Sequence, residues 1–404
     1  MKKILLALIA SAALITLAAC GETETEQGVF NDRVIIGNTA ATSGGLAFVG
    51  LPFKAGMEAY FNMVNDEGGV AGRIIEYIQY DDEFNPALGL SYTTELVEDD
   101  QVFALVGHFG TPTVAATRTY LNQIGIPRVY YATGLSELFN LNATGGERSS
   151  FPVQPIYDAE GEVMIVRAIG DLEAERIGVI YANDDAGRAL LRGIQLRAGE
   201  LGVPLTSIVQ VAPDADDMST AASIMLAAEV DLIIVAANQV PAATAVRALD
   251  AAGSTTPVMT SYVNADATWL TSVADVIGNF EIYGNAWIDI FDADGEPTDD
   301  YILFAETIGE EYADNAFAFA GWIAAATFVV GLRRVGDEPL TWESYIDAME
   351  SAPVELPFGV VVDYANGRRV GTQAMALLKA TIADATPLWV TEYPIQPISE
   401  IIGD

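Results

Sequence analysis

From residue 33 onward, short apolar runs alternate with longer segments of helical spacing, and this alternation is the feature that most constrains the fold. Residues 34–37, 74–80 and 102–107 have the composition of buried strands, whereas residues 51–66 place apolar side chains on one helical face. Strands that alternate with helices favour a parallel sheet covered by helices on both sides. The sequence therefore predicts an α/β fold.

A second series of the same kind occupies residues 176–260, and residues 136–150, rich in Asn, Gly and Ser, separate it from the first. A chain of 404 residues is long enough for two domains. The last predicted strands, from residue 358 on, follow one another without an intervening helix. We therefore expect two lobes, each with its own sheet, and a chain that crosses between them more than once.

Residues 102–134 contain the strongest binding signal. An apolar strand is followed by Gly110, then by Thr111, which suits a helix N-cap, and Pro112, which suits the first helical position. A helix that begins there aims free N–H groups and its positive dipole end outward, which favours an anion or a carboxylate. A second strand-to-loop transition, at residues 131–134, should lie beside the first, where open α/β sheets bind ligands. The plainer interpretation of Thr111 is a helix cap without a ligand.

The N-terminus predicts export. Two lysines and the apolar run 4–17 precede Ala-Ala-Cys at residues 18–20, as in a signal peptide that is too short to span a membrane comfortably. The site before Cys20 resembles a bacterial lipobox, and Cys20 is the only cysteine of the chain. We expect a signal peptide at residues 1–19, a lipid anchor on Cys20 and a flexible tether over residues 20–32. A plain secretion signal is the alternative.

Charge and composition exclude several classes of partner. The formal net charge is −37, and loss of Lys2 and Lys3 with the signal makes it −39, which argues against nucleic acid or an anionic membrane surface as a partner. Residues 316–330 are the most apolar later stretch, but their spacing indicates a core helix. We expect no metal and no cofactor, and the Gly-x-Ser-x-Gly and His/Cys patterns of hydrolases are missing.

Other polar features have plain structural interpretations. His108 is the only histidine, and a lone histidine usually serves the core. The adjacent carboxylates Asp81 and Asp82 suit turn or cap duty better than a catalytic or metal-binding pair. The acidic residues at 292–296 suggest calcium, yet the rest of the EF-hand spacing is missing.

Several motifs occur in a fixed order along the chain. They are Asn-Asp-Glu-Gly-Gly-Val-Ala-Gly-Arg at residues 65–73, Tyr-Asp-Asp at 80–82, Gly-Thr-Pro-Thr at 110–113, Ala-Thr-Gly at 132–134 and Tyr-Ala-Asn-Asp-Asp-Ala-Gly at 181–187. This order resembles the type I periplasmic binding proteins, in particular the leucine/isoleucine/valine-binding family of ABC-importer receptors. The resemblance implies two Rossmann-like lobes with parallel sheets, joined by three crossovers and closing on a ligand by hinge motion. It divides the chain into lobe one, residues 33–152 plus 283–357, and lobe two, residues 153–282 plus 358–404.

The resemblance also implies ligand contacts in lobe one. Thr111 and the backbone at Thr113 match the positions that hold the ligand carboxylate. The loop after the next strand supplies Ala132, Thr133 and Gly134 in the same way. Phe48 matches an aromatic contact from the first strand's loop approximately.

The ligand contacts expected from lobe two, which form the second wall of the site, depart from the family pattern. They are Asp184, Asn238, Gln239 and Tyr262. Ala186 stands where many relatives have an aromatic residue. Amino-acid receptors of the family often bind the ligand ammonium group with an acidic residue, and the matching position here lies near Tyr262. A carboxylate ligand without an amine therefore fits as well as an α-amino acid whose ammonium pairs with Asp184 or Asp289.

The leading hypothesis is a lipid-anchored, monomeric receptor that captures a small carboxylate compound for the permease of an ABC importer; branched-chain amino acids, amides and aromatic acids are candidates. A sensory receptor for a membrane signalling partner is an alternative that the sequence does not separate from transport. An anchored hydrolase is less favoured, because the sequence lacks the motifs of that chemistry.

Overall fold

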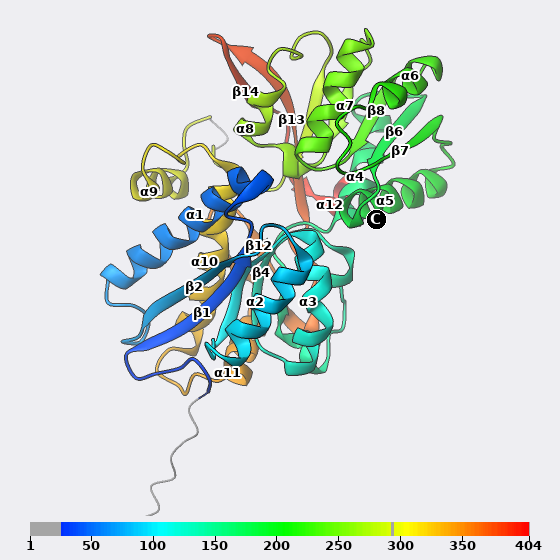
Figure 1. Ribbon diagram of the computed structural model, residues 1–404. Helices are drawn as coiled ribbons and strands as arrows, with labels where there is room; N and C mark the ends of the chain where they lie inside the picture. The colour runs from blue at the N-terminus through cyan, green and yellow to red at the C-terminus, as the bar shows by residue number, and fades with distance from the viewer. Residues whose placement is uncertain (1–25, 292–294, 404) are drawn as a thin grey trace, which may run out of the picture.

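The computed structural model describes residues 26–291 and 295–403, which form two lobes stacked one above the other (Figure 1). The sheet of the first lobe is parallel throughout. Its order is β2 (Ile74–Asp81), β1 (Arg33–Ala40), β3 (Ala104–Phe109), β4 (Arg128–Ala132) and β5 (Ser150–Phe151). The prediction of parallel α/β lobes is confirmed.

The sheet of the second lobe is parallel except at one side, where two antiparallel strands are added. Its order is β14 (Thr386–Pro397), β13 (Ala374–Ala383), β10 (Ile282–Ala286), β9 (Val258–Thr260), β8 (Leu232–Ala236), β6 (Ile177–Ala182) and β7 (Ser207–Val211). β14 is one of the strands predicted after residue 358. It tolerates three prolines because it is an edge strand, where a missing N–H leaves no ladder bond unmade.

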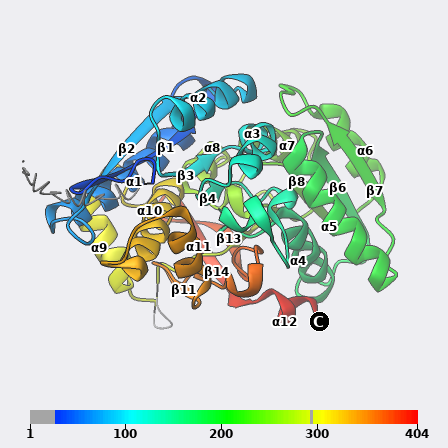
Figure 2. The same ribbon diagram turned by 90° about the horizontal axis from the view of Figure 1, so that it is seen from below.

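Helices cover both faces of each sheet. In the first lobe α2 and α3 lie on one face of the sheet and α1 and α10 on the other (Figure 2). The first lobe contains α1 (Ala47–Asp66), α2 (Pro86–Glu98), α3 (Thr111–Ile124), α9 (Asp299–Ile308), α10 (Ala316–Val335) and α11 (Trp342–Glu350), with the short strand pair β11 (Val354–Glu355) and β12 (Val361–Val362). The second contains α4 (Tyr157–Gly170), α5 (Asp185–Leu201), α6 (Ser219–Ala227), α7 (Val240–Ala251), α8 (Ala267–Ser272) and α12 (Ile398–Ile402).

The helix α10 forms the centre of the first lobe. Within residues 26–291 and 295–403 it is the one helix with the length and apolar composition of a membrane span, and most of it is buried inside the protein. It crosses α1 at backbone contact: a Cβ on Gly56 would lie 2.1 Å from the Ala318 carbonyl oxygen, and one on Gly321 would lie 1.9 Å from that of Phe53. The prediction of a core helix is confirmed.

The chain passes between the lobes three times. The first crossing follows β5, the second follows β10, and the third runs beside the first, where the Thr372 N–H and hydroxyl both donate to the Val153 carbonyl oxygen at 2.7 Å. The expected boundaries differ from the strand pairing. Residue 283 lies inside β10, which pairs with β9 and β13 of the second sheet. Phe358 packs on Phe319 of lobe one, with ring centroids 5.2 Å apart. The crossings therefore lie near residues 287 and 371.

Residues 26–32, which were expected to belong to a tether, pack on the first lobe. Residues 1–25, with Cys20 and the predicted signal peptide, lie outside the described residues. Residues 26–32 are held to lobe one: the Ile35 N–H donates to the Gly28 carbonyl oxygen at 2.8 Å, and the Gln27 amide donates to that of Val102 at 2.7 Å. Val29 is buried. The prediction of a flexible segment over residues 26–32 is wrong, because Val29 packs in the core and the hydrogen bonds of Gln27 and Gly28 hold the segment to lobe one.

Candidate functional site

The two predicted strand ends meet at one edge of the first sheet. Phe109 at the end of β3 pairs with Ala132 at the end of β4, and the Gly110 N–H donates to the Ala132 carbonyl oxygen at 3.3 Å. Gly110 rather than Thr111 is the N-cap of α3, so the expected cap role of Thr111 is wrong. Its hydroxyl lies instead 2.8 Å from the Thr133 hydroxyl. Two threonine hydroxyls therefore face each other at the predicted anion site.

The phenol group of Tyr157 lies next to this pair of threonines. Tyr157 is the first residue of α4 and is 3% exposed, and its oxygen accepts a hydrogen bond from Asn238 Nδ2 at 3.2 Å. Burial raises the pKa of Tyr157, and hydrogen bonds from the Gly134 N–H and from the Thr133 and Thr111 hydroxyls oppose that rise. The Asn238 amide of lobe two thus donates to the phenol oxygen, and the paired threonine hydroxyls of lobe one bond each other.

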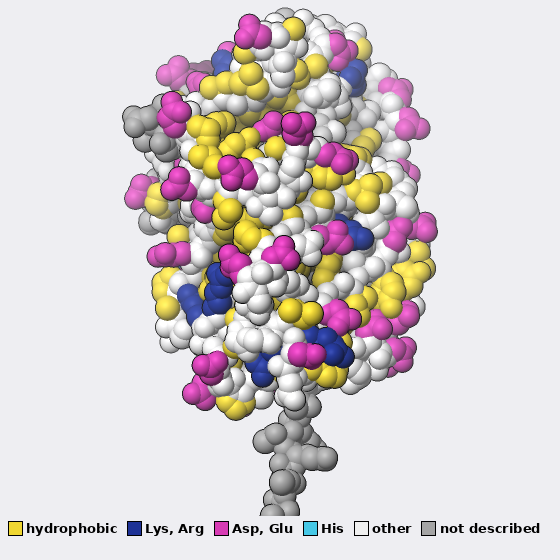
Figure 3. Space-filling view, turned by 90° about the vertical axis from the view of Figure 1, so that its left-hand side faces the viewer, with side chains coloured by type: hydrophobic (Ala, Val, Ile, Leu, Met, Phe, Trp, Pro, Cys, Tyr) yellow, Lys and Arg dark blue, Asp and Glu magenta, His cyan; other side chains and the backbone are white. Residues whose placement is uncertain are grey.

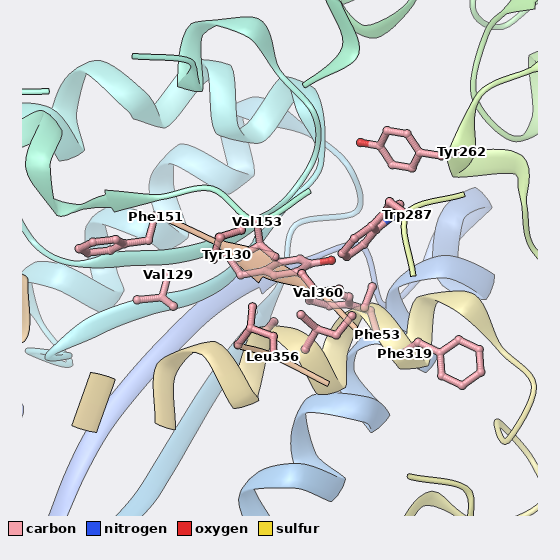
Figure 4. Packing of buried hydrophobic residues seen from close by; sticks show 14 of the residues in the cluster. Phe53, Val129, Tyr130, Phe151, Val153, Tyr262, Trp287, Phe319, Leu356 and Val360 are labelled. Carbon is pink, nitrogen blue, oxygen red and sulfur yellow. The ribbon is translucent and has the colours of Figure 1, made fainter. Parts of the chain in front are cut away.

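Aromatic side chains form the wall beside this oxygen. Tyr262, from the 3-10 turn Tyr262–Asn264, stacks on Tyr157 with ring centroids 5.8 Å apart and an interplanar angle of 25°. Trp287 packs edge-on against Tyr262 at 6.5 Å. Figure 4 shows Tyr262, Trp287 and Tyr130 next to one another, although they come from three separate segments. The site is therefore apolar and flat-sided, with its hydrogen-bond donors at one end.

Gly134 brings the first lobe into contact with this wall. A Cβ at this position would lie 2.5 Å from the Pro155 carbonyl oxygen, 2.8 Å from the Tyr262 hydroxyl and 2.9 Å from Cδ1 of Tyr157. Real Cβ atoms do not approach so closely, so the contact requires a residue without a side chain. Gly134 is thus part of the packing between the lobes.

A buried carboxyl group supports the second wall. Glu160 on α4 is fully buried and accepts hydrogen bonds from the Tyr262 N–H at 2.7 Å, the Ser261 hydroxyl at 2.9 Å and the Asn285 amide at 3.1 Å. Burial raises its pKa to about 7, while these three donors oppose the shift. Glu160 therefore fixes the turn that carries Tyr262 to α4 and to β10.

The structure brings together five of the predicted contacts around the Tyr157 oxygen and its ring. They are Thr111, Thr133, Gly134, Asn238 and Tyr262. Ala132 precedes them at the end of β4, half-buried, and Phe48 is half-buried near the start of α1, where it packs against the main core.

Three predicted contacts direct their side chains elsewhere. The Thr113 hydroxyl donates to Asp82 at 3.2 Å, so only its backbone N–H in the first turn of α3 remains for a ligand. The Gln239 amide donates to the Val263 carbonyl oxygen at 2.5 Å and is buried in lobe two. Asp184 caps α5 by accepting from the Gly187 N–H at 2.7 Å. Each of these three side chains is used in a hydrogen bond within the protein.

The plain interpretations of the other polar residues agree with their surroundings. Burial lowers the pKa of His108 to about 3, with the charge of Arg128 adding to the effect, and its Nε2 lies 2.7 Å from the Thr117 hydroxyl. Asp81 accepts from the Thr42 N–H, in the loop after β1, and from the Glu83 N–H of its own turn. Asp82 accepts from the hydroxyls of Thr39 and Thr113. Over the described ranges no group of three or more His, Cys, Asp or Glu side chains could hold a metal ion.

Tyr157 was missed at the sequence level. No motif of the sequence singles out Tyr157, the first residue of α4. Its contacts lie far away in the sequence: Asn238 is 81 positions further on. The available signal was the aromatic residue itself, at the start of the first helix after the crossover.

The chain matches known proteins over most of its length. A family profile described as periplasmic binding protein matches residues 33–386, so the chain belongs to the periplasmic binding proteins. The similar solved structures place it in the type I fold of that family.

Two sequence relatives bear amino-acid-binding names. An amino acid binding protein of Pseudomonas aeruginosa is 25% identical over 171 residues, which are 42% of this chain and 44% of that relative's length. A Leu/Ile/Val/Thr-binding protein of Salmonella typhimurium is 20% identical over 336 residues, which are 82% of this chain and 87% of that protein.

Solved structures of the same fold hold different ligands. A branched-chain amino acid ABC transporter protein from Thermus thermophilus with bound valine has a TM-score of 0.78 at 16% identity, with 92% of this chain and 99% of that chain covered. A solute binding protein from Rhodopseudomonas palustris in complex with benzoate has a TM-score of 0.73 at 17% identity, with 90% and 98% covered. The fold alone therefore does not decide the ligand.

Proposed function

We propose that this protein is an extracytoplasmic receptor that captures a small carboxylate compound between its lobes and delivers it to the permease of an ABC importer. The observation that carries the proposal is the meeting of hydrogen-bond donors from both lobes: the Thr111 and Thr133 hydroxyls lie 2.8 Å apart at the first turn of α3, and the Asn238 amide of the second lobe donates to the Tyr157 oxygen. A carboxylate accepts several such bonds through its two oxygens, and bonds to an ionised acceptor are stronger than those between neutral groups.

The mechanism requires binding and closure without a chemical step. Ligand held by the first lobe gains contacts to Asn238 and Tyr262 of the second, which favours the closed form. The closed form then presents both lobes to the permease. An anchor on Cys20 would keep the monomeric receptor near the membrane.

The second wall favours a ligand without an amine. Asp184 is engaged as the cap of α5, and Asp289 is exposed. Asp184 and Asp289 would therefore not pair with an ammonium group beside Tyr262, and the Glu160 carboxyl group there already accepts from three donors, so the buried charge would be costly. Figure 3 shows acidic side chains spread over one face of the molecule with fewer basic ones, which supports the exclusion of nucleic acid as a partner.

A thermal-shift screen tests the proposal. The panel contains benzoate, benzamide, L-valine, L-leucine and glutarate, and a ligand raises the melting temperature in a saturable way. If no compound of a broad panel shifts the melt, the receptor hypothesis loses its support.

Thr111→Ala should weaken the binding of a carboxylate found in that screen by about 1–3 kcal/mol, the range for a charge-assisted hydrogen bond. Isothermal titration measures this loss. The matched control is Thr244→Ala, because the Thr244 hydroxyl donates to the Val240 carbonyl oxygen within its own helix. Equal affinity of Thr111→Ala and wild type, with circular dichroism unchanged, would remove the site assignment.

A further inference from the structure

We infer that the first lobe carries a further binding site, separate from the one between the lobes, for a small oxyanion such as phosphate. The site is a cavity between the C-terminal half of α3, the segment 136–150 and the chain at Arg369. Its volume is about 80 Å³, several times the roughly 10–15 Å³ that one water molecule requires. The cavity lies far along α3 from the threonine pair, since Arg118 and Asn122 are roughly 10–17 Å from Thr111 at a rise of about 1.5 Å per residue.

Three donor groups on this cavity have no acceptor within the described part of the chain. The Arg118 guanidinium makes no hydrogen bond and no ion pair there. Asn122 uses its side-chain oxygen to accept from Arg128, which leaves its NH₂ group without a partner among the same residues. Arg369 is 1% exposed, and its Nε also lacks a partner there, whereas its two terminal nitrogens are engaged within the protein. Guanidinium and amide donors that line one cavity and lack acceptors favour an oxyanion.

A buried cation lies next to the cavity without a counter-charge. Arg128, the first residue of β4, is 1% exposed and donates to uncharged oxygens only, those of the Asn122 side chain, the Gly146 carbonyl and the Ser149 hydroxyl. Over residues 26–291 and 295–403 no Asp or Glu forms an ion pair with it. Carboxylates are not scarce, since the chain has 56 Asp and Glu against 19 Lys and Arg. An anion bound beside Asn122 would offset the cost of this buried charge.

Two carboxylates also line the cavity, and their charges oppose an anion. Glu147 accepts from the Asn140 amide at 2.7 Å, and Glu137 is exposed. Neither forms an ion pair with an arginine within the residues that the structure describes. Glu147 therefore provides a test of the sign of the charge that the cavity binds.

The burial of Arg369 favours a small ion over an acidic segment of another protein. Only a group that enters the cavity reaches its Nε, and the rim carries the apolar side chains of Leu138 and Phe139 rather than further basic ones. A free oxyanion enters such a cavity without burying a second protein surface.

Titration calorimetry of the purified protein with sodium phosphate tests the inference, in buffers brought to equal ionic strength with sodium chloride. Phosphate should bind in a saturable way and raise the melting temperature accordingly. Arg118→Gln should weaken phosphate binding at least roughly tenfold, because it removes a charged donor. The variant loses no internal contact, since Arg118 makes none within the described residues. The matched control is Arg176→Gln, an exposed arginine of the second lobe whose nearest carboxylate oxygen lies 3.6 Å away; its affinity for phosphate should equal that of wild type.

Glu147→Gln should change the affinity in the opposite direction. Its amide keeps an oxygen that can accept from Asn140, whereas the negative charge on the cavity is gone. Phosphate should therefore bind roughly 2- to 5-fold more tightly than to wild type. A merely structural disturbance of the cavity would not produce a gain.

The outcomes keep this site apart from the site between the lobes. Saturable binding that is lost in Arg118→Gln and strengthened in Glu147→Gln supports the inference. No saturable binding of phosphate or sulfate, or weaker binding by Glu147→Gln, overturns it, and equal affinity of Arg118→Gln and wild type means an adventitious ion only. Loss of phosphate binding in Thr111→Ala but not in Arg118→Gln places the anion between the lobes and overturns the further site. Tighter binding of a tetraglutamate peptide than of phosphate, abolished by Arg118→Gln, overturns the small-ion class in favour of an acidic protein segment.

Discussion

Among single residues, the two threonines of the site differ from the threonines inside helices. Thr244 and Thr327 each donate to the carbonyl oxygen four residues earlier, which is the usual partner of a helical hydroxyl. Thr111 stands in the first turn of α3 and has no preceding helical turn, and Thr133 follows the end of β4. Their hydroxyls are therefore available to each other and to an oxygen between them.

Gly134→Ala should reduce the affinity for a carboxylate ligand more than tenfold, because the new Cβ meets the Pro155 carbonyl oxygen and the Tyr262 hydroxyl and keeps the lobes apart. Gly134 is not among the residues with positive φ, so alanine brings no backbone strain. Titration calorimetry measures the change. Gly45→Ala is the control, since nothing lies within 4 Å of its added Cβ. Equal affinity of both variants would contradict the packing role.

The sequence located one wall of the site and missed the residue at its centre. Thr111 and Thr133 could be predicted because each lies within two residues of the end of an apolar strand, a local pattern. Tyr157 was missed because its partners come from other segments, and only the fold brings Asn238 to it. The inward direction of the Gln239 side chain also depends on the fold. The backbone of Gln239 has a φ of 55°, and its amide donates to the Val263 carbonyl oxygen, 24 positions further on.

Among the elements, strand ends and helix starts determine the site. β3, α3 and β4 were predictable, because an apolar run, a glycine and a Thr-Pro pair all indicate the same local structure. The lobe boundaries were less predictable. β10 resembles any buried strand, and only its pairing with β9 and β13 assigns it to the second lobe.

Glu160→Gln should flatten part of the pH dependence of stability. Burial raises the pKa of Glu160 from 4.5 to about 7, so the folded protein holds this proton more tightly than the unfolded chain does. The resulting stability is fully present below pH 4.5 and is lost as the pH rises through 7, about 3 kcal/mol in total. Wild type should therefore lose that stability relative to Glu160→Gln between pH 4.5 and 7.5.

Urea unfolding at a series of pH values measures this difference. The lowered pKa of His108 acts in the opposite direction over part of the range, but it is common to both proteins and cancels in their difference. Glu310→Gln, at an exposed position, is the control and should follow wild type. A constant difference between wild type and Glu160→Gln across the range would contradict the assigned pKa.

For the whole molecule, the question is what holds the lobes together without a ligand. Arg192 of the second lobe donates to the Ser136 hydroxyl of the first at 2.7 Å and to Asp158 at 2.9 Å. Asp266 caps α8 and also accepts from the Ala316 N–H, at the start of α10 in the other lobe, at 3.3 Å. Asp266 is buried, whereas Arg192 is about half exposed. The two contacts should therefore respond differently to salt.

Arg192→Ala should shift the unliganded protein toward the open form and weaken ligand binding by up to about fivefold, because it removes the hydrogen bond to Ser136 of the first lobe, and a hydrogen bond contributes a net of roughly 0.5–1.5 kcal/mol. The deficit should shrink at about 1 M salt, because screening weakens the exposed ion pair with Asp158 that holds Arg192 in place within the second lobe. Small-angle scattering and calorimetry at low and high salt measure both effects. The control is Arg247→Ala, an equally exposed arginine whose partners Asp275 and Ser272 belong to its own lobe. If both variants behave alike, the contact between Arg192 and Ser136 does not stabilise closure, and Asp266 becomes the residue to vary.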